Sequence, residues 1–507
     1  MEIPVDEMRI MRKSRSVGDR RAVLCGFGSV ILSLLVAGCG GSTVISQPAA
    51  APGFLPAAGT YTSAQTVTLT DSSAGASIYY TLDGTNPTTG STPYSAPINI
   101  VATTTIKAIA TAPGFSTSAI ASGTYTIVLP DDIVCWGDSM TSGDQGIVDI
   151  GRYPTILQEE VTPTVFNQGV GGQTSTQIGV RQGGIPTYVA VMGGSIPAYG
   201  DGGVTVTFPT GYEPLTDPEI HTSGWILGVE GELTLSAALP DGTFTFTRTS
   251  VGDSPVSAPG TPQYIPITPY SRFVSIFWEG RNNLFKTSAG PWGQAQIVSD
   301  IATQVAALPT GQNYLVLSVA NEDIPEEWSD GSRYSTITGL NSTLSSIYGN
   351  YYLDIRSILV NAYNPSLPTD ESDYLNDVVP TSLRAIVAQG TLGGNIGTAD
   401  TSFSVNLTSG SLMAWEILTI DSENIRILEA SGTTVTSATR GYGGTLAPHL
   451  AGAAVSGSNP THLNKQGYTV VADAIATKLA AISGSGKYDT PDSTMPATIV
   501  SSKPAPR

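Results

Sequence analysis

Two short segments far apart in this chain constrain its fold most. One is the tetrapeptide Gly-Asp-Ser-Met at 137–140, which follows an apolar run over residues 133–136, and the other begins at His462. An apolar run of this length is typical of a buried parallel strand, so Ser139 is expected on the turn from that strand into a helix. The apolar residues within 464–482 recur at helical spacing, so His462 is expected just before a helix. Histidine is the usual base that activates serine, so the two segments predict a serine hydrolase.

The composition limits the kinds of protein that this chain can be. Its 56 glycines and 34 prolines, with only 13% charged residues, favour short strands and turns over large helical bundles. A net charge of −18 argues against nucleic acid as a partner, because phosphates would be repelled. The length allows three or four domains at about 150 residues each.

The amino terminus reads as an export signal. Basic residues precede an apolar run over 22–37, and that run is shorter than the roughly 20 residues that a membrane span needs. The sequence Leu-Val-Ala-Gly-Cys that ends at Cys39 resembles the bacterial lipobox. The resemblance implies a signal peptide at 1–38, a lipid on Cys39 that contacts the membrane, and a location in the bacterial cell envelope. Gly40 in place of aspartate favours the outer membrane or cell surface. A plain signal peptide or a buried helix is the alternative.

The cysteines predict no disulfide within the chain. Cys25 lies in the signal, Cys39 would carry lipid and Cys135 lies in the strand before Ser139. Removal of residues 1–38 takes away six basic and four acidic residues and leaves 17 basic against 37 acidic residues, a net charge of −20.

A flexible tether over 39–52 precedes a region at 53–128 that alternates in the manner of short strands and predicts a small β-sandwich. The run from Tyr79 to Thr88, with Tyr94 and a later Thr-Thr-Thr-Ile-Lys-Ala segment, resembles the chitobiase/β-hexosaminidase carboxy-terminal-like module. Such modules accompany secreted enzymes that act on polysaccharides. A spacer without a ligand is an alternative of at least equal weight.

Residues 129–482 alternate strand and helix patterns, which predicts a parallel sheet covered on both faces. The expected strands are 133–136, 165–166, 272–278 and 314–319. Two stretches, at about 180–270 and 390–457, instead read as β insertions. The tail at 483–507 is polar and Pro-rich and is expected to be disordered.

Four segments in this order, at 137–140, 167–174, 280–283 and 459–464, resemble the conserved blocks of the SGNH (GDSL-type) hydrolases. The resemblance implies an α/β fold, a flavodoxin-like parallel sheet with helices on both faces, here interrupted by the two β insertions and preceded by the β-sandwich.

Carried onto this chain, the family pattern makes Ser139 the nucleophile and His462 its general base. The backbone N–H groups of Ser139 and Gly172 and the side-chain amide of Asn282 would form the oxyanion hole. Gly171 replaces Gly172 if the register differs by one. Each residue alone also has a structural interpretation, as a helix cap, a turn or a hinge.

One position departs from the family pattern. Asn459 stands where an aspartate usually orients the histidine, and asparagine supplies no negative charge. Three outcomes are open, in this order: a slower esterase, a substitute carboxylate such as Asp377 or Asp373 that reaches His462, or binding without activity.

Metal and cofactor chemistry are not expected. His221 and His449 fall in the two insertions, where structural or exposed roles are expected, and three scattered histidines make no cluster for a metal. No cofactor is implied.

The sequence therefore predicts a lipid-anchored serine esterase, a carboxylic ester hydrolase that forms an acyl-serine intermediate. Analogy with the amino-terminal module suggests O-acetyl groups of a polysaccharide as its substrate, with a small acylated molecule as the other substrate class. The alternatives are a lipase or short-chain esterase, and a surface carbohydrate-binding or adhesion protein with a decayed active site.

Overall fold

The computed structural model describes residues 46–61, 65–100, 103–128, 131–143, 145–287, 290–442 and 445–483. The expected signal peptide, the lipidation site Cys39, the first part of the tether and the tail after Ser483 lie outside the described residues. No described helix combines the length and apolar character that a membrane span requires.

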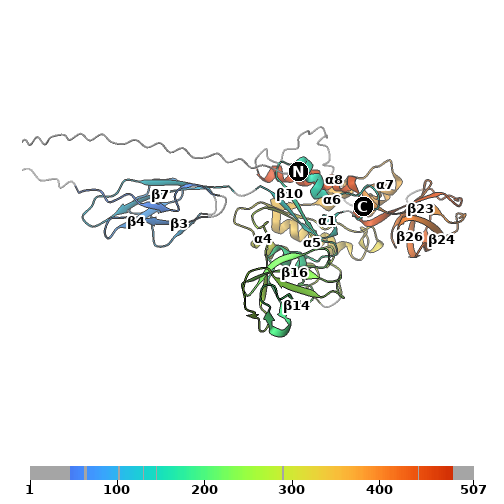
Figure 1. The fold of residues 1–507 in the computed structure, drawn as a ribbon. Coiled ribbons are helices and arrows are strands. Elements are labelled where there is room, and N and C mark those ends of the chain that lie inside the picture. Colours follow the sequence, from blue (N-terminus) through green and yellow to red (C-terminus); the bar gives the residue numbers. More distant parts are fainter. Residues whose placement is uncertain are drawn as a thin grey trace, which may run out of the picture.

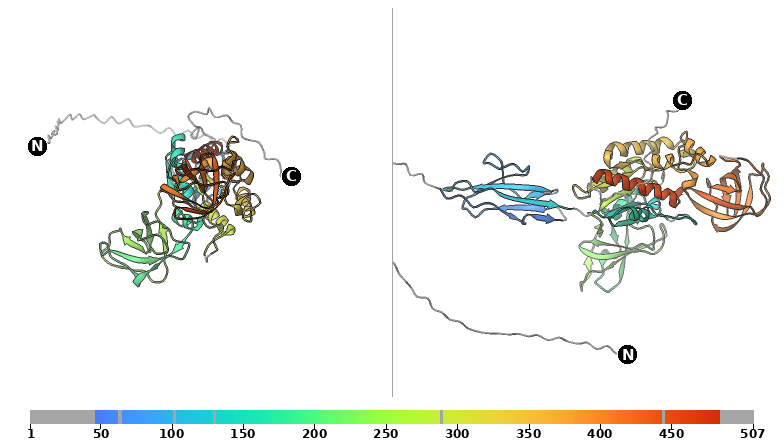
Figure 2. Two further views of the ribbon diagram at one scale, coloured as in Figure 1. Left: turned by 90° about the vertical axis from the view of Figure 1, so that its right-hand side faces the viewer. Right: turned by 90° about the horizontal axis from the view of Figure 1, so that it is seen from above.

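The amino-terminal unit is a β-sandwich of two sheets, with strand orders β1-β3-β6 and β2-β8-β7-β4-β5. Apolar side chains of both sheets, among them Val67, Ile106 and Tyr125, are fully buried between them. Figure 1 and the right-hand view of Figure 2 show the sandwich set apart from the rest of the chain. Its strands are β1 (Gly53–Leu55), β2 (Gly59–Tyr61), β3 (Gln65–Thr70), β4 (Ser77–Thr81), β5 (Thr92–Pro93), β6 (Ile98–Ile100), β7 (Thr104–Thr111) and β8 (Ala121–Ile127).

A five-stranded sheet with the order β10-β9-β20-β21-β22 lies at the centre of the molecule, and all of its pairings are parallel. Every residue of β9 and of β20 is buried, as their continuous apolar sequences require. The strands are β9 (Ile133–Gly137), β10 (Val165–Gly169), β20 (Val274–Trp278), β21 (Tyr314–Leu317) and β22 (Tyr352–Leu353).

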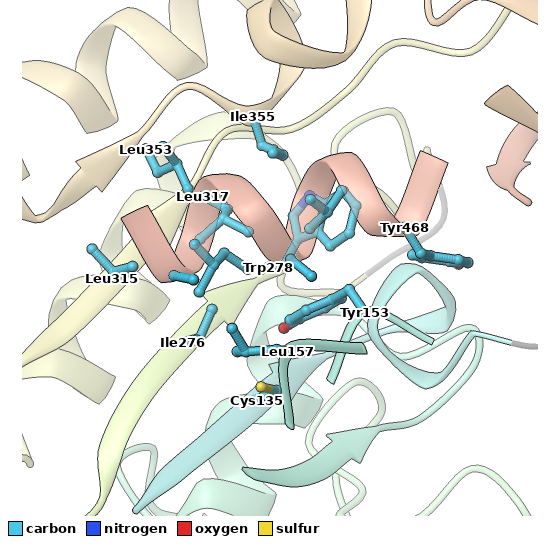
Figure 3. Packing of buried hydrophobic residues seen from close by; sticks show 14 of the residues in the cluster. Cys135, Tyr153, Leu157, Ile276, Trp278, Leu315, Leu317, Leu353, Ile355 and Tyr468 are labelled. Atoms are coloured by element: carbon cyan, nitrogen blue, oxygen red, sulfur yellow. The ribbon is translucent and has the colours of Figure 1, made fainter. Parts of the chain in front are cut away.

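Helices pack on both faces of this sheet. One core joins the face of Cys135 and Ile276 to α2, α6 and α8, and the other joins the face of Val134 and Phe277 to α3, α4 and α5. Figure 3 shows the first core, in which Tyr153, Trp278 and Tyr468 pack between α8 and the strands. The helices are α1 (Ser139–Ser142), α2 (Tyr153–Glu160), α3 (Ser175–Gln182), α4 (Gln294–Ala306), α5 (Tyr334–Tyr348), α6 (Ile355–Asn361), α7 (Pro368–Asn376) and α8 (Lys465–Ser483). The short 3-10 helices are Met192–Gly194, Pro325–Glu327, Gly349–Tyr351 and Thr381–Leu383.

A seven-stranded antiparallel sheet is inserted between α3 and β20, with the order β11-β19-β15-β16-β17-β14-β12. Burial alternates strictly along β16, so one face of the sheet is packed and the other is partly open to solvent. Its strands are β11 (Thr187–Tyr188), β12 (Ala190–Val191), β14 (Gly203–Thr207), β15 (Thr222–Ile226), β16 (Val229–Leu235), β17 (Phe244–Arg248) and β19 (Gln263–Pro266); a separate pair is formed by β13 (Ser195–Ile196) and β18 (Val256–Ser257).

A closed barrel of six strands follows α7, with the order β23-β24-β27-β26-β25-β28. In Figure 1 it lies at the opposite end of the molecule from the sandwich. Its strands are β23 (Arg384–Leu392), β24 (Phe403–Gly410), β25 (Ile417–Ile420), β26 (Glu423–Ser431), β27 (Thr434–Thr439) and β28 (Ala454–Leu463). Closure leaves the barrel without free strand edges.

The fold class expected from the sequence is wrong for this chain. Strands account for 34% and helices for 22% of the described residues, so this part of the chain is mainly β and is not a flavodoxin-like α/β protein with additions. The five parallel strands are a minority of the strands, which otherwise form the sandwich, the inserted sheet and the barrel. The expectation gave too much weight to the apolar runs of one short sheet.

Candidate functional site

Ser139 begins a short helix at the carboxyl end of β9. Asp138 caps that helix, since its Oδ1 accepts a hydrogen bond of 2.9 Å from the N–H of Met140. Two glycines let the chain turn this tightly. A Cβ on Gly137 would lie 2.1 Å from Oγ1 of Thr141, and one on Gly169 would lie 2.1 Å from the backbone nitrogen of Ser142. Ser139 is therefore held on a packed turn at the edge of the sheet.

His462 lies near the end of β28, the last strand of the barrel, and reaches Ser139. Its Nε2 is 2.9 Å from Oγ of Ser139. Burial lowers the pKa of His462, and the nearby negative charge of Glu322 opposes that shift. The imidazole is accordingly neutral at pH 7, the form in which Nε2 accepts the serine proton.

Asn459 holds the backbone before the ring rather than the ring itself. Its Oδ1 accepts hydrogen bonds from the N–H groups of Thr461 at 2.7 Å and His462 at 2.8 Å. Among the described residues, no side chain forms a hydrogen bond with Nδ1 of His462. The pair therefore lacks the third group that usually fixes the tautomer and stabilises the imidazolium.

The expected substitute carboxylates do not reach His462, so that interpretation is wrong. Asp373 binds Arg384 and Thr381, whereas Asp377 binds Arg356 and Tyr334. Asp373 lies on α7 and Asp377 directly after it, and each carboxylate is taken up by an ion pair with an arginine. The carboxylate whose charge raises the pKa of His462 is Glu322, which pairs with Arg281 and was not expected from the sequence. No motif marks it, since it lies in a loop after β21.

The expected oxyanion-hole residues lie on two loops. Gly172 is exposed with φ of +74°, and a Cβ on Gly171 would lie 3.9 Å from Cβ of Ser139, so this turn borders the serine. The side-chain amide of Asn282 donates a hydrogen bond of 3.0 Å to the carbonyl of Gln173. Asn282 thus ties its loop to the glycine turn, which fixes the two segments relative to one another.

Charged groups are buried beneath this site. Arg281 forms two hydrogen bonds to Glu327, at 2.6 and 2.7 Å, and a longer one to Glu322. Burial raises the pKa of Asp138 to about 6, partly offset by the Met140 hydrogen bond and the charge of Arg281. Burial also raises the pKa of Glu279 well above its usual range. Asp138, Glu279 and Arg281 line a cavity of about 10 Å³, about the volume that one water needs.

The other two histidines take no part in this site. His449 is buried in the barrel between Asp421 and Glu423, each 2.7 Å away, and His221 is exposed and pairs with Glu232. No cluster of three or more metal-binding side chains occurs in the described part of the chain.

Comparison with known proteins identifies the amino-terminal unit. Residues 56–122 match the family model of the chitobiase/β-hexosaminidase carboxy-terminal domain. The resemblance predicted for the sandwich from its Tyr-Tyr-Thr-Leu-Asp-Gly motif is thereby confirmed.

A second similarity extends over a larger part of the chain. The tail spike protein of Salmonella phage epsilon15 is 26% identical over 253 residues, which cover 45% of this chain and 22% of that protein. The chain therefore spans about a fifth of the length of this relative.

These matches overturn the assignment to the SGNH hydrolases. They show similarity to a chitobiase/β-hexosaminidase carboxy-terminal domain and to a phage tail spike protein, and they give no support to the SGNH or GDSL family. The four sequence blocks are too short and too rich in glycine and asparagine to carry the assignment alone. The functional terms that depended on it, esterase and carbohydrate esterase, are wrong with it.

Proposed function

We propose that this protein is a surface carbohydrate-binding or adhesion-type protein. The observation that carries the proposal is the similarity to a phage tail spike protein. The chitobiase-type domain at 56–122 supports it, because it is a second unit from carbohydrate-associated proteins. The serine esterase predicted as the main function, with its lipase variant, is overturned by the same matches.

The architecture is suited to adhesion. Three β units surround one small sheet, and each presents sheet or loop surfaces to solvent. Aromatic side chains remain exposed on the inserted sheet, with Tyr188 at 52% and Trp225 at 36% of full accessibility. Aromatic rings offer flat surfaces with apolar faces, which suit the C–H faces of sugars.

Binding of the purified chain to a polysaccharide array tests this proposal. We expect retention on at least one neutral bacterial polysaccharide, with little dependence on salt because a neutral glycan offers no charge to the acidic chain, whose net charge is −18. A chain heated above its unfolding temperature serves as the control. An array with no glycan retained by the folded chain would contradict the proposal.

A hydrolytic reaction at Ser139 is a separate proposal that no comparison tests. It is favoured by the 2.9 Å contact of Ser139 with a half-buried, neutral His462. The lack of a carboxylate on Nδ1 predicts slow chemistry, since loss of that group costs about 10⁴ in turnover in serine proteases, the system in which it was measured.

Labelling with a fluorophosphonate probe is the expected readout for this pair. The wild type should be labelled, and both Ser139→Ala and His462→Gln should abolish labelling. Because burial lowers the pKa of His462, labelling should persist below pH 6.5 and decline only at more acidic pH. Ser142→Ala, in the same short helix, is the matched control and should label normally. A wild type that the probe does not label would contradict the hydrolytic proposal and would leave the binding proposal unaffected.

Attachment to a bacterial envelope through lipid on Cys39 likewise stays a proposal, supported by the lipobox-like sequence. Incorporation of labelled palmitate into the wild type but not Cys39→Ser would check it.

A further inference from the structure

A groove of about 410 Å³ lies between α4 and the start of the inserted sheet. Its aromatic lining comes from Tyr188 on β11 and from Tyr212 on the loop before β15. Gln296, Ser299 and Asp300 of α4 supply polar groups on the opposite side. Neither Ser139 nor His462 lines the groove.

The backbone around both tyrosines is held in place, and the ring of Tyr188 is exposed while Tyr212 is half-buried. Thr187, which is buried beside Tyr188, donates a hydrogen bond of 3.1 Å from Oγ1 to the carbonyl of Tyr212. The N–H of Tyr212 binds the carbonyl of Pro209 at 3.0 Å. These bonds fix the Tyr212 loop against β11, which reduces the conformational entropy that a ligand would have to remove.

The polar side of the groove is also organised. Asp300 is 2% exposed, and its Oδ2 accepts 2.7 Å hydrogen bonds from the hydroxyls of Ser175 and Thr176. Its Oδ1 accepts a 2.7 Å bond from Nε2 of Gln296, which orients that amide and leaves Oε1 of Gln296 as an acceptor. Hydroxyls and amides of this kind bind sugar hydroxyl groups in defined directions.

The charge of the groove excludes an anionic ligand. No lysine, arginine or histidine lines it, and the carboxylate of Asp300 lies at its base. The chain as a whole is acidic, with a net charge of −18. A neutral ligand avoids this repulsion.

The aromatic surface continues along the exposed face of the inserted sheet. Tyr188 is paired with Gln263, and Ile265, two residues further on β19, is paired with Trp225. Paired residues and residues two apart point to the same face, and all four are exposed. Strand spacing and rise place the backbones of Tyr188 and Trp225 about 12 Å apart. The site can therefore take an extended chain rather than a single sugar.

We propose that this groove binds a neutral glycan. Tyr188 and Tyr212 stack on its sugar rings, Gln296 binds its hydroxyl groups, and Trp225 contacts a sugar further along the same glycan. The inference deepens the proposed carbohydrate-binding function and rests on it.

Titration calorimetry with the neutral polysaccharide that the array selects tests the site. Tyr188→Ala and Tyr212→Ala should each weaken binding by about tenfold, the scale of one aromatic stacking contact. Trp225→Ala should weaken binding of a long fragment while leaving a disaccharide fragment unaffected. The matched control is Tyr199→Ala, because Tyr199 is 55% exposed on the same insertion but lies outside the groove. Thermal unfolding of each variant checks that it is folded.

The outcomes distinguish failure of the groove proposal from failure of the carbohydrate-binding proposal. If the wild type binds a glycan but folded Tyr188→Ala and Tyr212→Ala bind it equally well, the groove is not the site and the proposed function stands. Binding of acidic glycans alone would also overturn the inference. A wild type that binds no glycan overturns both.

Discussion

Replacing Arg384 by methionine is expected to lower the free energy of unfolding by about 3–5 kcal/mol, the usual cost of breaking a buried ion pair. Arg384 is fully buried where the barrel meets the central unit, and it binds Asp323 at 2.5 Å and Asp373 at 2.9 Å. Without it, Asp373 keeps a buried carboxylate whose pKa burial already raises to about 7. Asp323 would retain only Arg426 as a cationic partner.

The measurement is urea unfolding followed by tryptophan fluorescence, in which Trp328 reports on this junction because its Nε1 donates a hydrogen bond to Asp323. Arg333→Met is the matched control. Arg333 is 43% exposed and 3.9 Å from Glu327, so the same substitution should cost less than about 1 kcal/mol. Equal losses in the two variants would show that the Arg384 network does not stabilise the junction.

Replacing Glu423 by glutamine is expected to destabilise the barrel by about 2 kcal/mol at pH 7, after allowance for solvent screening near its rim. Burial by itself would raise the pKa of Glu423, but hydrogen bonds from Arg440, His449 and two backbone N–H groups lower it to about 2. Arg440 binds both carboxylate oxygens at 2.8 Å. Glutamine keeps the shape of the side chain but removes the charge that these donors face.

The pH dependence follows from the lowered pKa. A carboxylate that is more acidic in the folded state stabilises the protein above its ordinary pKa of 4.5, and this stabilisation is lost as the pH falls toward about 2. The unfolding temperature of the wild type should therefore exceed that of Glu423→Gln at pH 7. This difference should shrink as the pH falls from 4.5 toward about 2. Glu429→Gln, at an exposed position of the same strand, should match the wild type at every pH. A constant difference between wild type and Glu423→Gln down to pH 2 would contradict the charge as the cause.

Local patterns predicted local structure well. The apolar runs at 133–136 and 314–319 correspond to β9 and β21, and the helical spacing within 464–482 corresponds to α8. The Tyr-Tyr-Thr-Leu-Asp-Gly motif identified the chitobiase-type domain correctly. These features depend on neighbouring residues, which is why one sequence sufficed.

The fold class and the family were predicted wrongly because both predictions depended on local patterns, and the fold depends on contacts between distant residues. Four short blocks favoured an α/β hydrolase, whereas most of the chain forms β units whose strands are individually short and weakly marked. Closure of the barrel depends on pairing between β23 and β28, whose residues are far apart in the sequence. No local pattern specifies such pairing.

The sequence by itself determined the short buried strands, the final helix and the amino-terminal domain, because side-chain periodicity and turn residues act over a few positions. Tertiary structure alone decided which side chains meet. It brought His462 to Ser139 across 323 positions, gave Asn459 a backbone partner, and committed Asp373 and Asp377 to arginines. Those contacts depend on long-range packing, burial and charge pairing, which emerge only when the barrel and the central sheet fold against one another.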